Sequence, residues 1–305
     1  MEYKQAIDIR ISNFINKVLN FYIRKRESNI QRSKNKIWEK NFKTSEYFIH
    51  KLDENLSIKL YKDSYLSKLV YEQFEVDEID FVNNFLKEGD IFLDIGANVG
   101  LFSLYAAKKV GSTGSVIAFE PAYDTYNRLL ENCELNKLSN VRPFKLGLSN
   151  ENTTLELNIS SNGFEAWNTF VKSNDNKFSS KESVEVNSLD YFLSQNSIDT
   201  DKISLIKLDV EGFEINVLEG ASALLAKENA PVFMVEFTDD NAIAAGHCCH
   251  EIYKLLNQCG YTWYTYDAAK KKLIFDPMRS TYPYNNLIAV KNIARNPRLS
   301  GFLID

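Results

Sequence analysis

Hydrophobic and polar positions divide the chain into a helical N-terminal segment and a longer stretch of alternating strands and helices. Near the start, apolar residues recur at helical spacing from Ile7 to Ile23, which predicts an amphipathic helix with its basic residues mostly off the apolar stripe. Residues 28–46 are polar and predict a linker or a second short helix. The loosely alternating residues 49–61 predict a hairpin, and helical periodicity returns between residues 74 and 86.

From residue 91 onward, apolar runs of strand length alternate with helical segments. The expected strands are IFLDI, SVIAFE, VRPFKL, ISLIKLD and PVFMVEF, followed by YTWYTYD and NLIAVKN. The expected helices cover residues 101–110, 122–136, 214–227 and 249–258. Apolar strands separated by helices are typical of an α/β fold, with a mostly parallel sheet covered by helices on both faces. The Asn-, Ser- and Thr-rich residues 150–187 predict an insertion or hairpin, after which Ser188 caps a short helix.

This pattern predicts three segments. Residues 1–75 form an N-terminal extension of helix and hairpin, residues 76–293 form the α/β domain, and residues 294–305 form a C-terminal tail. The chain is 44% hydrophobic and 25% charged, as expected of a globular protein. The sequence shows neither a spanning apolar run nor a signal peptide, so we expect a cytoplasmic protein, and its four cysteines form no CxxC pair.

Charge is distributed unevenly along the chain. Residues 1–45 carry eleven Lys/Arg against four Asp/Glu, a net charge of +7, which leaves −12 for the rest of a chain whose net charge is −5. The acidic body argues against a nucleic-acid substrate. The basic N-terminal helix has three interpretations: packing on its own domain or on a second subunit of a homodimer, contact with the inner face of a membrane, or nucleic-acid binding.

A strand that ends in an acidic residue leads into a glycine-rich turn. In GDIFLDIGANVG the strand ends at Asp94, the turn contains Gly96, Ala97, Asn98 and Gly100, and a helix follows. Glycine lets a backbone turn tightly and approach a ligand, and the helix N-terminus offers free N–H groups. The next strand ends at Glu120, which precedes Pro121 and is suited to the two hydroxyls of a ribose. A tight turn without a ligand is the alternative.

The turn lacks the GxGxxG pattern of dinucleotide-binding folds and instead has a carboxylate at the strand tip. This arrangement suits S-adenosylmethionine, which carries an ammonium, a sulfonium and a ribose.

The motifs DIGANVG, FEP, SLDYFL and IKLDVEGFEINVLEGA, in this order, resemble the FkbM-type methyltransferases, which are S-adenosylmethionine-dependent enzymes of the class I fold. The resemblance covers about residues 85–240, and IKLDVEGFE with VLEGA is its most specific part. It implies a Rossmann-like sheet of seven strands with the last antiparallel. It also implies O-methyl transfer to a hydroxyl of a sugar, glycan or secondary metabolite.

The same resemblance implies the roles of individual residues. Asp94, Gly96, Ala97, Asn98 and Gly100 would surround the methionine part of the cofactor, and Glu120 with Pro121 would lie at the ribose. Gly147, Leu148 and Ser149 would lie near the adenine. Most class I enzymes place an acidic residue near that last position, and this chain has none.

Carboxylates at the ends of two central strands are the candidate catalytic groups. Asp209 and Glu211 follow ISLIKLD, and Glu236 lies in PVFMVEF. They have three competing roles: accepting the acceptor's proton, holding a divalent cation such as Mg²⁺ through Asp209 and Glu236, or fixing the structure. In the structural role Asp209 caps the helix that begins at Glu214, and Glu211 is salt-bridged. Glu214 is expected to be solvated or to interact with the helix dipole.

Two histidines and a tryptophan complete the candidates. His247, or His250 in the same GHCCH segment, has the intrinsic pKa of a base that works near neutral pH. Trp167 is a candidate lid over the acceptor or a residue of a small core.

Two other functions fit the same pattern. One is an NAD-dependent oxidoreductase on a Rossmann sheet, and the other is a non-catalytic scaffold that retains the fold. We expect the acceptor to be chosen by residues 1–75 and 150–187, whose pattern does not identify it.

Overall fold

The structure is a computed structural model that describes residues 32–160, 168–171, 178–292 and 296–304. It divides into two compact units, Met1–Phe48 and Ile49–Asp305. The amphipathic helix expected between residues 7 and 23, and Trp167, lie outside the described residues.

In the first unit, residues 32–41 are helical, in agreement with the second short helix expected within residues 28–46. The rings of Trp38, Phe42 and Phe48 pack edge to face, with centroids 4.8 to 5.6 Å apart. Aromatic pairs prefer this geometry because the positive ring edge meets the negative ring face.

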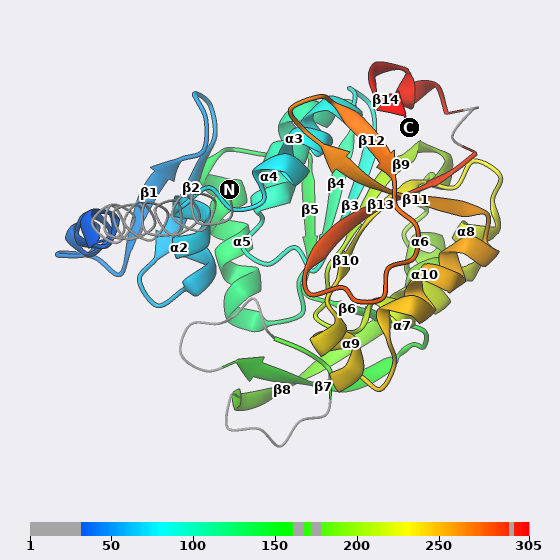
Figure 1. Ribbon diagram of the computed structural model, residues 1–305. Coiled ribbons are helices and arrows are strands. Elements are labelled where there is room, and N and C mark those ends of the chain that lie inside the picture. Colours follow the sequence, from blue (N-terminus) through cyan, green and yellow to red (C-terminus); the bar gives the residue numbers. More distant parts are fainter. Residues whose placement is uncertain (1–31, 161–167, 172–177, 293–295, 305) are drawn as a thin grey trace, which may run out of the picture. The chain divides into compact units, whose positions relative to one another are not determined.

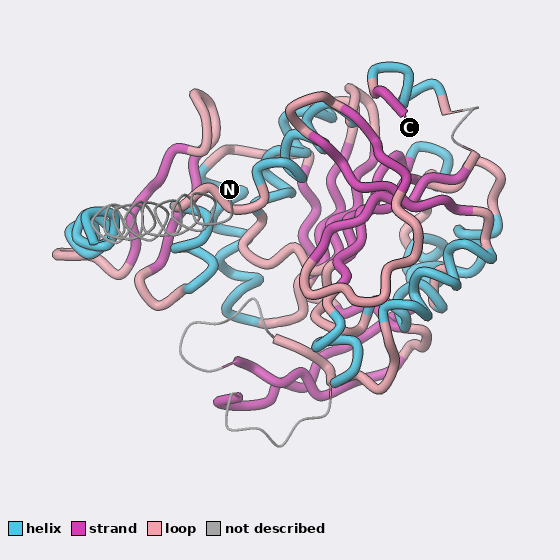
Figure 2. Tube along the Cα trace, viewed as in Figure 1, coloured by secondary structure: helices cyan, strands magenta, loops and turns pink. Residues whose placement is uncertain are grey.

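The second unit is built on a nine-stranded sheet with helices along it (Figures 1 and 2). Its strand order is β14-β12-β11-β13-β10-β9-β3-β4-β5. The strands are β3 (Ile91–Ile95), β4 (Ser115–Phe119), β5 (Val141–Phe144), β9 (Ile203–Leu208), β10 (Val232–Phe237), β11 (Tyr261–Asp267), β12 (Lys272–Phe275), β13 (Asn285–Lys291) and β14 (Leu303–Ile304). Strands β5, β4, β3, β9 and β10 are parallel, and β13 is antiparallel to both of its neighbours, β10 and β11.

This order confirms the α/β fold and the antiparallel last strand. The seven expected strands are all present, but the sheet is larger than the seven strands that the resemblance implied. Strands β12 and β14 extend the edge beyond β11, because β12 forms a hairpin with β11 and the C-terminal segment pairs with β12.

The helices of this unit and two 3-10 turns are α2 (Tyr65–Tyr71), α3 (Val76–Phe85), α4 (Leu101–Val110), α5 (Tyr123–Leu135), α6 (Leu189–Gln195), η2 (Thr200–Lys202), α7 (Glu214–Glu219), α8 (Ser222–Ala226), α9 (Asp239–Ala244), α10 (Cys249–Gln258) and η4 (Pro297–Gly301). Two small sheets complete it. One contains β1 (Tyr47–Lys51), which straddles the boundary of the units, and β2 (Ser57–Tyr61); the other contains β6 (Gly147–Ser149), β7 (Thr153–Ser160) and β8 (Phe178–Ser188).

Successive residues of the central strands point to opposite faces of the sheet. In β3, Phe92 packs in the core formed with α3 and α4, whereas Leu93 and Ile95 pack in the core formed with α6, α7, α8 and α10. The same alternation holds in β4, β9 and β10, so helices bury both faces. Asp94, Lys207 and Glu236 therefore belong to the α3–α4 face.

The helix expected over residues 214–227 is wrong in one respect, because it is interrupted between α7 and α8. At the interruption, a Cβ atom on Gly220 would lie 2.0 Å from the carbonyl oxygen of Ser149, so a larger residue there would collide with β6. The hairpin over residues 49–61, the strands within 150–187 and the Ser188 cap of α6 are confirmed. Among the residues that the structure describes, we find no helix whose length and apolar character would let it cross a membrane.

Candidate active site

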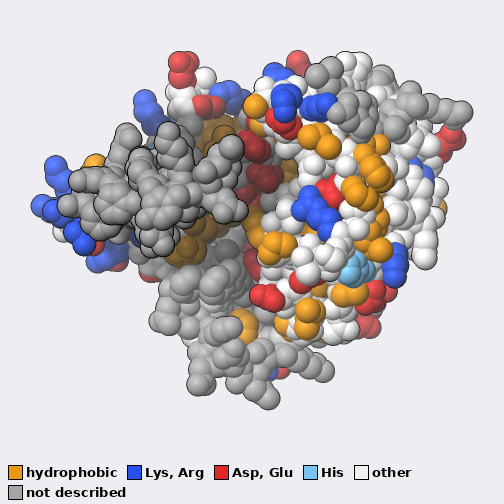
Figure 3. All heavy atoms as spheres, in the orientation of Figure 1, with side chains coloured by type: hydrophobic (Ala, Val, Ile, Leu, Met, Phe, Trp, Pro, Cys, Tyr) orange, Lys and Arg blue, Asp and Glu red, His pale blue; other side chains and the backbone are white. Residues whose placement is uncertain are grey.

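A cavity of about 470 Å³ lies at the carboxyl ends of the central parallel strands. Ten of the residues singled out in the sequence line it: Gly96, Ala97, Asn98, Glu120, Pro121, Gly147, Leu148, Asp209, Glu211 and Glu236. Asp94, Gly100, Ser149 and His247 lie behind its wall rather than on it. In the space-filling view, acidic side chains gather near the middle of the face, with hydrophobic side chains beside them (Figure 3).

The glycine-rich turn after β3 is shaped by its contact with the loop after β9. Gly96 has φ +80°, and a Cβ atom there would lie 1.8 Å from the carbonyl oxygen of Asp209. Gly100 has φ +92°, and a Cβ atom there would lie 2.5 Å from Leu129 of α5. Both glycines are therefore required by the packing of the protein itself, in addition to any approach of a ligand.

Glu120 is buried and bonded to the backbone of both neighbouring turns. Its Oε2 accepts a hydrogen bond from the Asn98 N–H and its Oε1 accepts one from the Ala122 N–H, each at 3.0 Å. Burial raises the pKa of Glu120 to about 8, although these two hydrogen bonds lower it. The bonds fix the carboxyl group where the ends of β3 and β4 meet.

Asp94 and Lys207 are register partners on β3 and β9, and both are buried. The Oδ2 atom of Asp94 accepts a hydrogen bond of 2.6 Å from the Ser103 hydroxyl, and Oδ1 has no hydrogen-bond partner among the described residues. Burial raises the pKa of Asp94. Lys207 Nζ lies 2.6 Å from Asp209 Oδ2 and 4.7 Å from the centre of the Phe102 ring.

Neighbouring carboxylates stabilise the charged form of Lys207. Burial alone would lower the pKa of its ammonium, but the carboxylates of Asp209, Glu75 and Asp94 raise the pKa above its ordinary value. The pKa of Asp209 is lowered in turn, since Lys207 outweighs the effect of burial. Asp209 and Lys207 therefore remain an ion pair at neutral pH.

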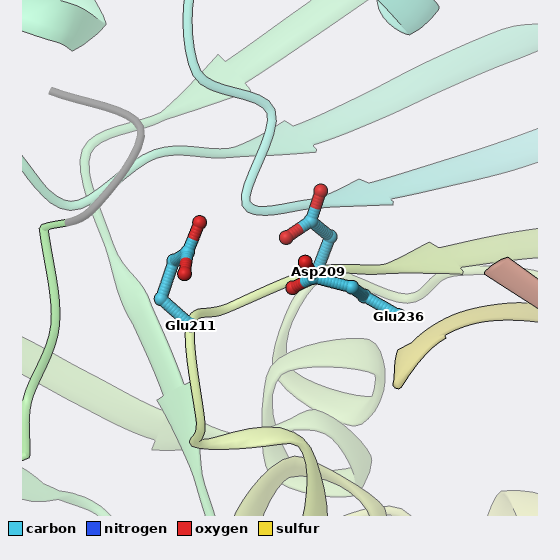
Figure 4. Close-up of side chains that lie close together, drawn as sticks. All are labelled: Asp209, Glu211 and Glu236. Carbon is cyan, nitrogen blue, oxygen red and sulfur yellow. The ribbon is translucent and has the colours of Figure 1, made fainter. Parts of the chain in front are cut away.

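Asp209, Glu211 and Glu236 form a cluster, in which each residue places a carboxylate oxygen within 4.8 Å of the others (Figure 4). Burial, followed by the charges of Asp209 and Glu214, raises the pKa of Glu211 well above its usual range. Burial and then the charges of Asp209 and Glu211 do the same for the pKa of Glu236. Three carboxylates at this spacing also make a ligand set that suits Mg²⁺.

Neutral side chains position two members of this cluster. Asn241 Nδ2 donates a hydrogen bond of 2.6 Å to Glu211 Oε2, and the Thr238 hydroxyl donates one of 3.0 Å to Glu236 Oε1. Glu211 is thus held by an amide and not by the salt bridge that its structural role required.

Glu214 folds the loop that carries these acids. It is 3% exposed, and its Oε1 accepts hydrogen bonds from the N–H groups of Val210 and Gly212. Of the two alternatives for Glu214, the solvated one is therefore wrong, whereas its place in the first turn of α7 agrees with the helix-dipole one. Asp209 does not cap α7, whose N-cap position is Phe213 without a side-chain hydrogen bond.

The two histidines lie away from the acids that face the cavity. His247 Nε2 is 2.9 Å from the carbonyl oxygen of Gly212 and His250 Nε2 is 2.7 Å from the carbonyl oxygen of Arg279, and neither residue lines the cavity. These contacts suit side chains that support the loops.

Three residues of the site were missed in the sequence: Lys207, Asn241 and Glu75. Lys207 had a signal, since a lysine inside the apolar run LIKL needs a buried partner. Asn241 and Glu75 had none, because they reach the cavity from α9 and from the residue before α3.

Comparisons with known proteins give the family. The model of the methyltransferase FkbM domain matches residues 94–262. Methyltransferase sdnD of Sordaria araneosa is 31% identical over 180 residues, which are 50% of this chain and 68% of that protein. Hexuronic acid methyltransferase AglP of Haloferax volcanii is 30% identical over 158 residues, which are 51% of this chain and 59% of that protein.

Among solved structures, methyltransferase FkbM from Methylobacillus flagellatus KT matches with a TM-score of 0.42 and 15% identity, over 66% of this chain and 43% of that one. The family model covers more than half of the chain and begins at Asp94, the residue that opens the glycine-rich turn. The chain therefore belongs to the FkbM methyltransferase family.

Proposed function

We propose that the protein is an S-adenosylmethionine-dependent O-methyltransferase that acts on a hydroxyl of a sugar, glycan or secondary metabolite. The observation that carries this proposal is that the glycine-rich turn with Glu120 and the carboxylates Asp209, Glu211 and Glu236 line one cavity. Methyl transfer requires a donor site and an acceptor site within one enclosure. The family favours this function over the nicotinamide-dependent and scaffold alternatives.

The residues present fit the cofactor that the family implies. Asp94 Oδ1 is buried without a described partner, and acidic groups outnumber cations in the cavity, which suits the ammonium and sulfonium of S-adenosylmethionine. Gly96, Ala97 and Asn98 would hold its methionine part, Glu120 and Pro121 the ribose, and Leu148 the adenine. Gly100 and Ser149 would support these contacts from behind. When bound, S-adenosylmethionine supplies a methyl group activated by a positively charged sulfur.

Glu211 is the proposed general base. A base that works near neutral pH needs a pKa near the working pH, and the pKa of Glu211 is raised well above its usual range, whereas that of Asp209 is lowered. Glu211 would accept the proton of the acceptor hydroxyl. Asp209 would hold the side chain of Lys207 in place through their ion pair and would repel anions from the cavity. His247 would position the loop through the Gly212 carbonyl.

A divalent cation is the alternative use of the same carboxylates. Asp209 and Glu236, with Glu211 as a third ligand, would hold Mg²⁺. Loss of turnover in EDTA and its recovery with Mg²⁺ would favour this role over a metal-free base.

The acceptor class is proposed from the relatives' names. One relative acts on a hexuronic acid by its name, and we propose a carbohydrate or another small hydroxylated molecule for this chain.

Calorimetry and a transfer assay test the proposal. We expect S-adenosylhomocysteine to bind and NAD(H) not to bind, and we expect ¹³C-methyl S-adenosylmethionine to give a methoxy carbon signal on an accepted sugar or metabolite. Binding of the nicotinamide alone, or a signal from an N-methyl group, would contradict the proposed function.

A further inference from the structure

Glu75 lies outside every motif of the sequence, in the turn between α2 and α3. Gln73 and Glu75 flank Phe74 and have φ of 69° and 52°, a left-handed conformation that L-residues avoid. This turn brings Phe74 and Glu75 to the wall of the cavity. Unusual backbone conformations that persist at a cavity are a reason to look for a function there.

The carboxylate of Glu75 is held on one side only. Its Oε1 accepts hydrogen bonds from the Tyr284 hydroxyl at 2.9 Å and from Asn286 Nδ2 at 3.1 Å. No described residue donates a hydrogen bond to Oε2. One oxygen is therefore fixed while the other remains available to a donor in the cavity.

The charge of the cavity favours a cationic donor. Among the described residues that line it, Lys207 is the sole Lys or Arg, and its ammonium is already paired with Asp209. Burial, followed by the charges of Asp209 and Glu78, raises the pKa of Glu75 to about 7, although Lys207 lowers it. A bound cation would favour the ionised form of this carboxyl group.

The three clustered carboxylates of the cavity have partners of their own. Asp209 is paired with Lys207, Glu211 accepts a hydrogen bond from Asn241, and Glu236 accepts one from Thr238. On the proposed function, on which this inference rests, we infer that Glu75 binds the α-ammonium group of the methionine part of S-adenosylmethionine. Its Oε2 accepts the ammonium hydrogen bond, and Tyr284 and Asn286 hold the carboxylate in place.

Calorimetry with two ligands tests the inference. S-Adenosylhomocysteine carries the ammonium, whereas 5′-methylthioadenosine keeps the adenosine and thioether but lacks the amino-acid group. For Glu75→Gln we expect the Kd of S-adenosylhomocysteine to rise about 10- to 100-fold, as for a lost charge-assisted hydrogen bond, and that of 5′-methylthioadenosine to change less than about twofold. Glu78→Gln is the matched control, since Glu78 also accepts a hydrogen bond from Asn286 but does not line the cavity.

The pH dependence of the unmodified protein gives a second measurement that needs no variant. Glu75 is faced by Lys207, Asp209, Glu78 and Tyr284, and Lys207 and Asp209 keep their charges near neutral pH. As the pH falls from 8 to 6, Glu75 gains a proton and loses its negative charge. The Kd of S-adenosylhomocysteine should therefore rise relative to that of 5′-methylthioadenosine. Glu75→Gln should remove this difference.

The outcomes separate the inference from the proposed function. If the unmodified protein binds S-adenosylhomocysteine and Glu75→Gln binds it equally well, the inference is overturned and the proposed function stands. If Glu75→Gln weakens the binding of both ligands equally, the inference is also overturned, because that result indicates a structural role for Glu75. If the unmodified protein binds neither ligand, the inference and the proposed function are both contradicted.

Discussion

The carboxylates on β3 and after β4 differ from those after β9 and at the end of β10 in what holds them. Asp94 and Glu120 are bonded to uncharged groups of the two adjoining βα units: the Ser103 hydroxyl and the N–H groups of Asn98 and Ala122. Asp209, Glu211 and Glu236 instead shift the pKa values of one another, and Asp209 is also paired with the ammonium of Lys207. The first pair forms a fixed frame, and the second group forms an electrostatically coupled set.

We propose from this difference that the two sides of the cavity have separate tasks. Substitutions on the β3–β4 side should alter ligand binding with little effect on the chemical step. Substitutions on the β9–β10 side should alter proton transfer with little effect on cofactor binding. The following predictions either sharpen or break that division.

Glu211→Gln should have the largest effect. We expect kcat to fall about 10²- to 10⁴-fold, the usual contribution of general base catalysis, with the Kd of S-adenosylhomocysteine unchanged. Because the base must be ionised, activity of the unmodified enzyme should be lost as the pH falls through the raised pKa of Glu211. Asp240→Asn, another acid on the cavity wall, serves as the control and should keep most of the turnover. An unchanged kcat in Glu211→Gln would move the base to Glu236 or to a metal-bound group.

Lys207→Met should destabilise the fold by about 3–5 kcal/mol, since it leaves the buried carboxylate of Asp94 and the partly buried carboxylate of Asp209 without their cation. Chemical denaturation measures this loss. Lys181→Met is the matched control, because its 3.0 Å ion pair with Glu156 is exposed and should contribute no more than about 1 kcal/mol. Equal losses of unfolding free energy in the two variants would show that the ion pair of Lys207 and Asp209 contributes no more to stability than an exposed pair.

Gly96→Ala compared with Gly246→Ala measures how closely the two sides approach. Both glycines have φ near +85°, but nothing lies within 4 Å of a Cβ atom at Gly246, whereas one at Gly96 meets the Asp209 carbonyl. We expect Gly246→Ala to cost about 1–2 kcal/mol of stability and Gly96→Ala about 2–5 kcal/mol. Similar losses would mean that the loops after β3 and β9 move apart freely.

His247→Ala should have the smallest effect. It removes one hydrogen bond to the Gly212 carbonyl, which is worth about 1 kcal/mol in unfolding experiments. We expect kcat to fall less than about tenfold, since the imidazole does not line the cavity. A loss as large as that of Glu211→Gln would make His247 the base and contradict the assignment.

Several elements were predictable from sequence because their signals are local. The helices at 101–110 and 249–258 and the strands at 91–95 and 203–208 follow from periodicity, and Ser188 caps α6 as expected. The requirement for glycine at position 220 was not predictable, since it depends on the approach of Ser149, more than 70 residues earlier in the chain. The same applies to Glu214, whose burial depends on how residues 209–214 fold.

The sequence by itself determined the α/β sheet, the family and the positions of Asp94, Glu120, Asp209 and Glu211 at strand ends, because strand periodicity and glycine-rich turns are written in neighbouring residues. Only the tertiary structure decided the electrostatic surroundings of these acids. The pKa of Asp209 is lowered by Lys207 while that of Glu211 is raised by burial and by Asp209, and Glu75 joins them from a distant turn. Charges interact through space, so the chemistry of the site depends on which groups the fold brings together.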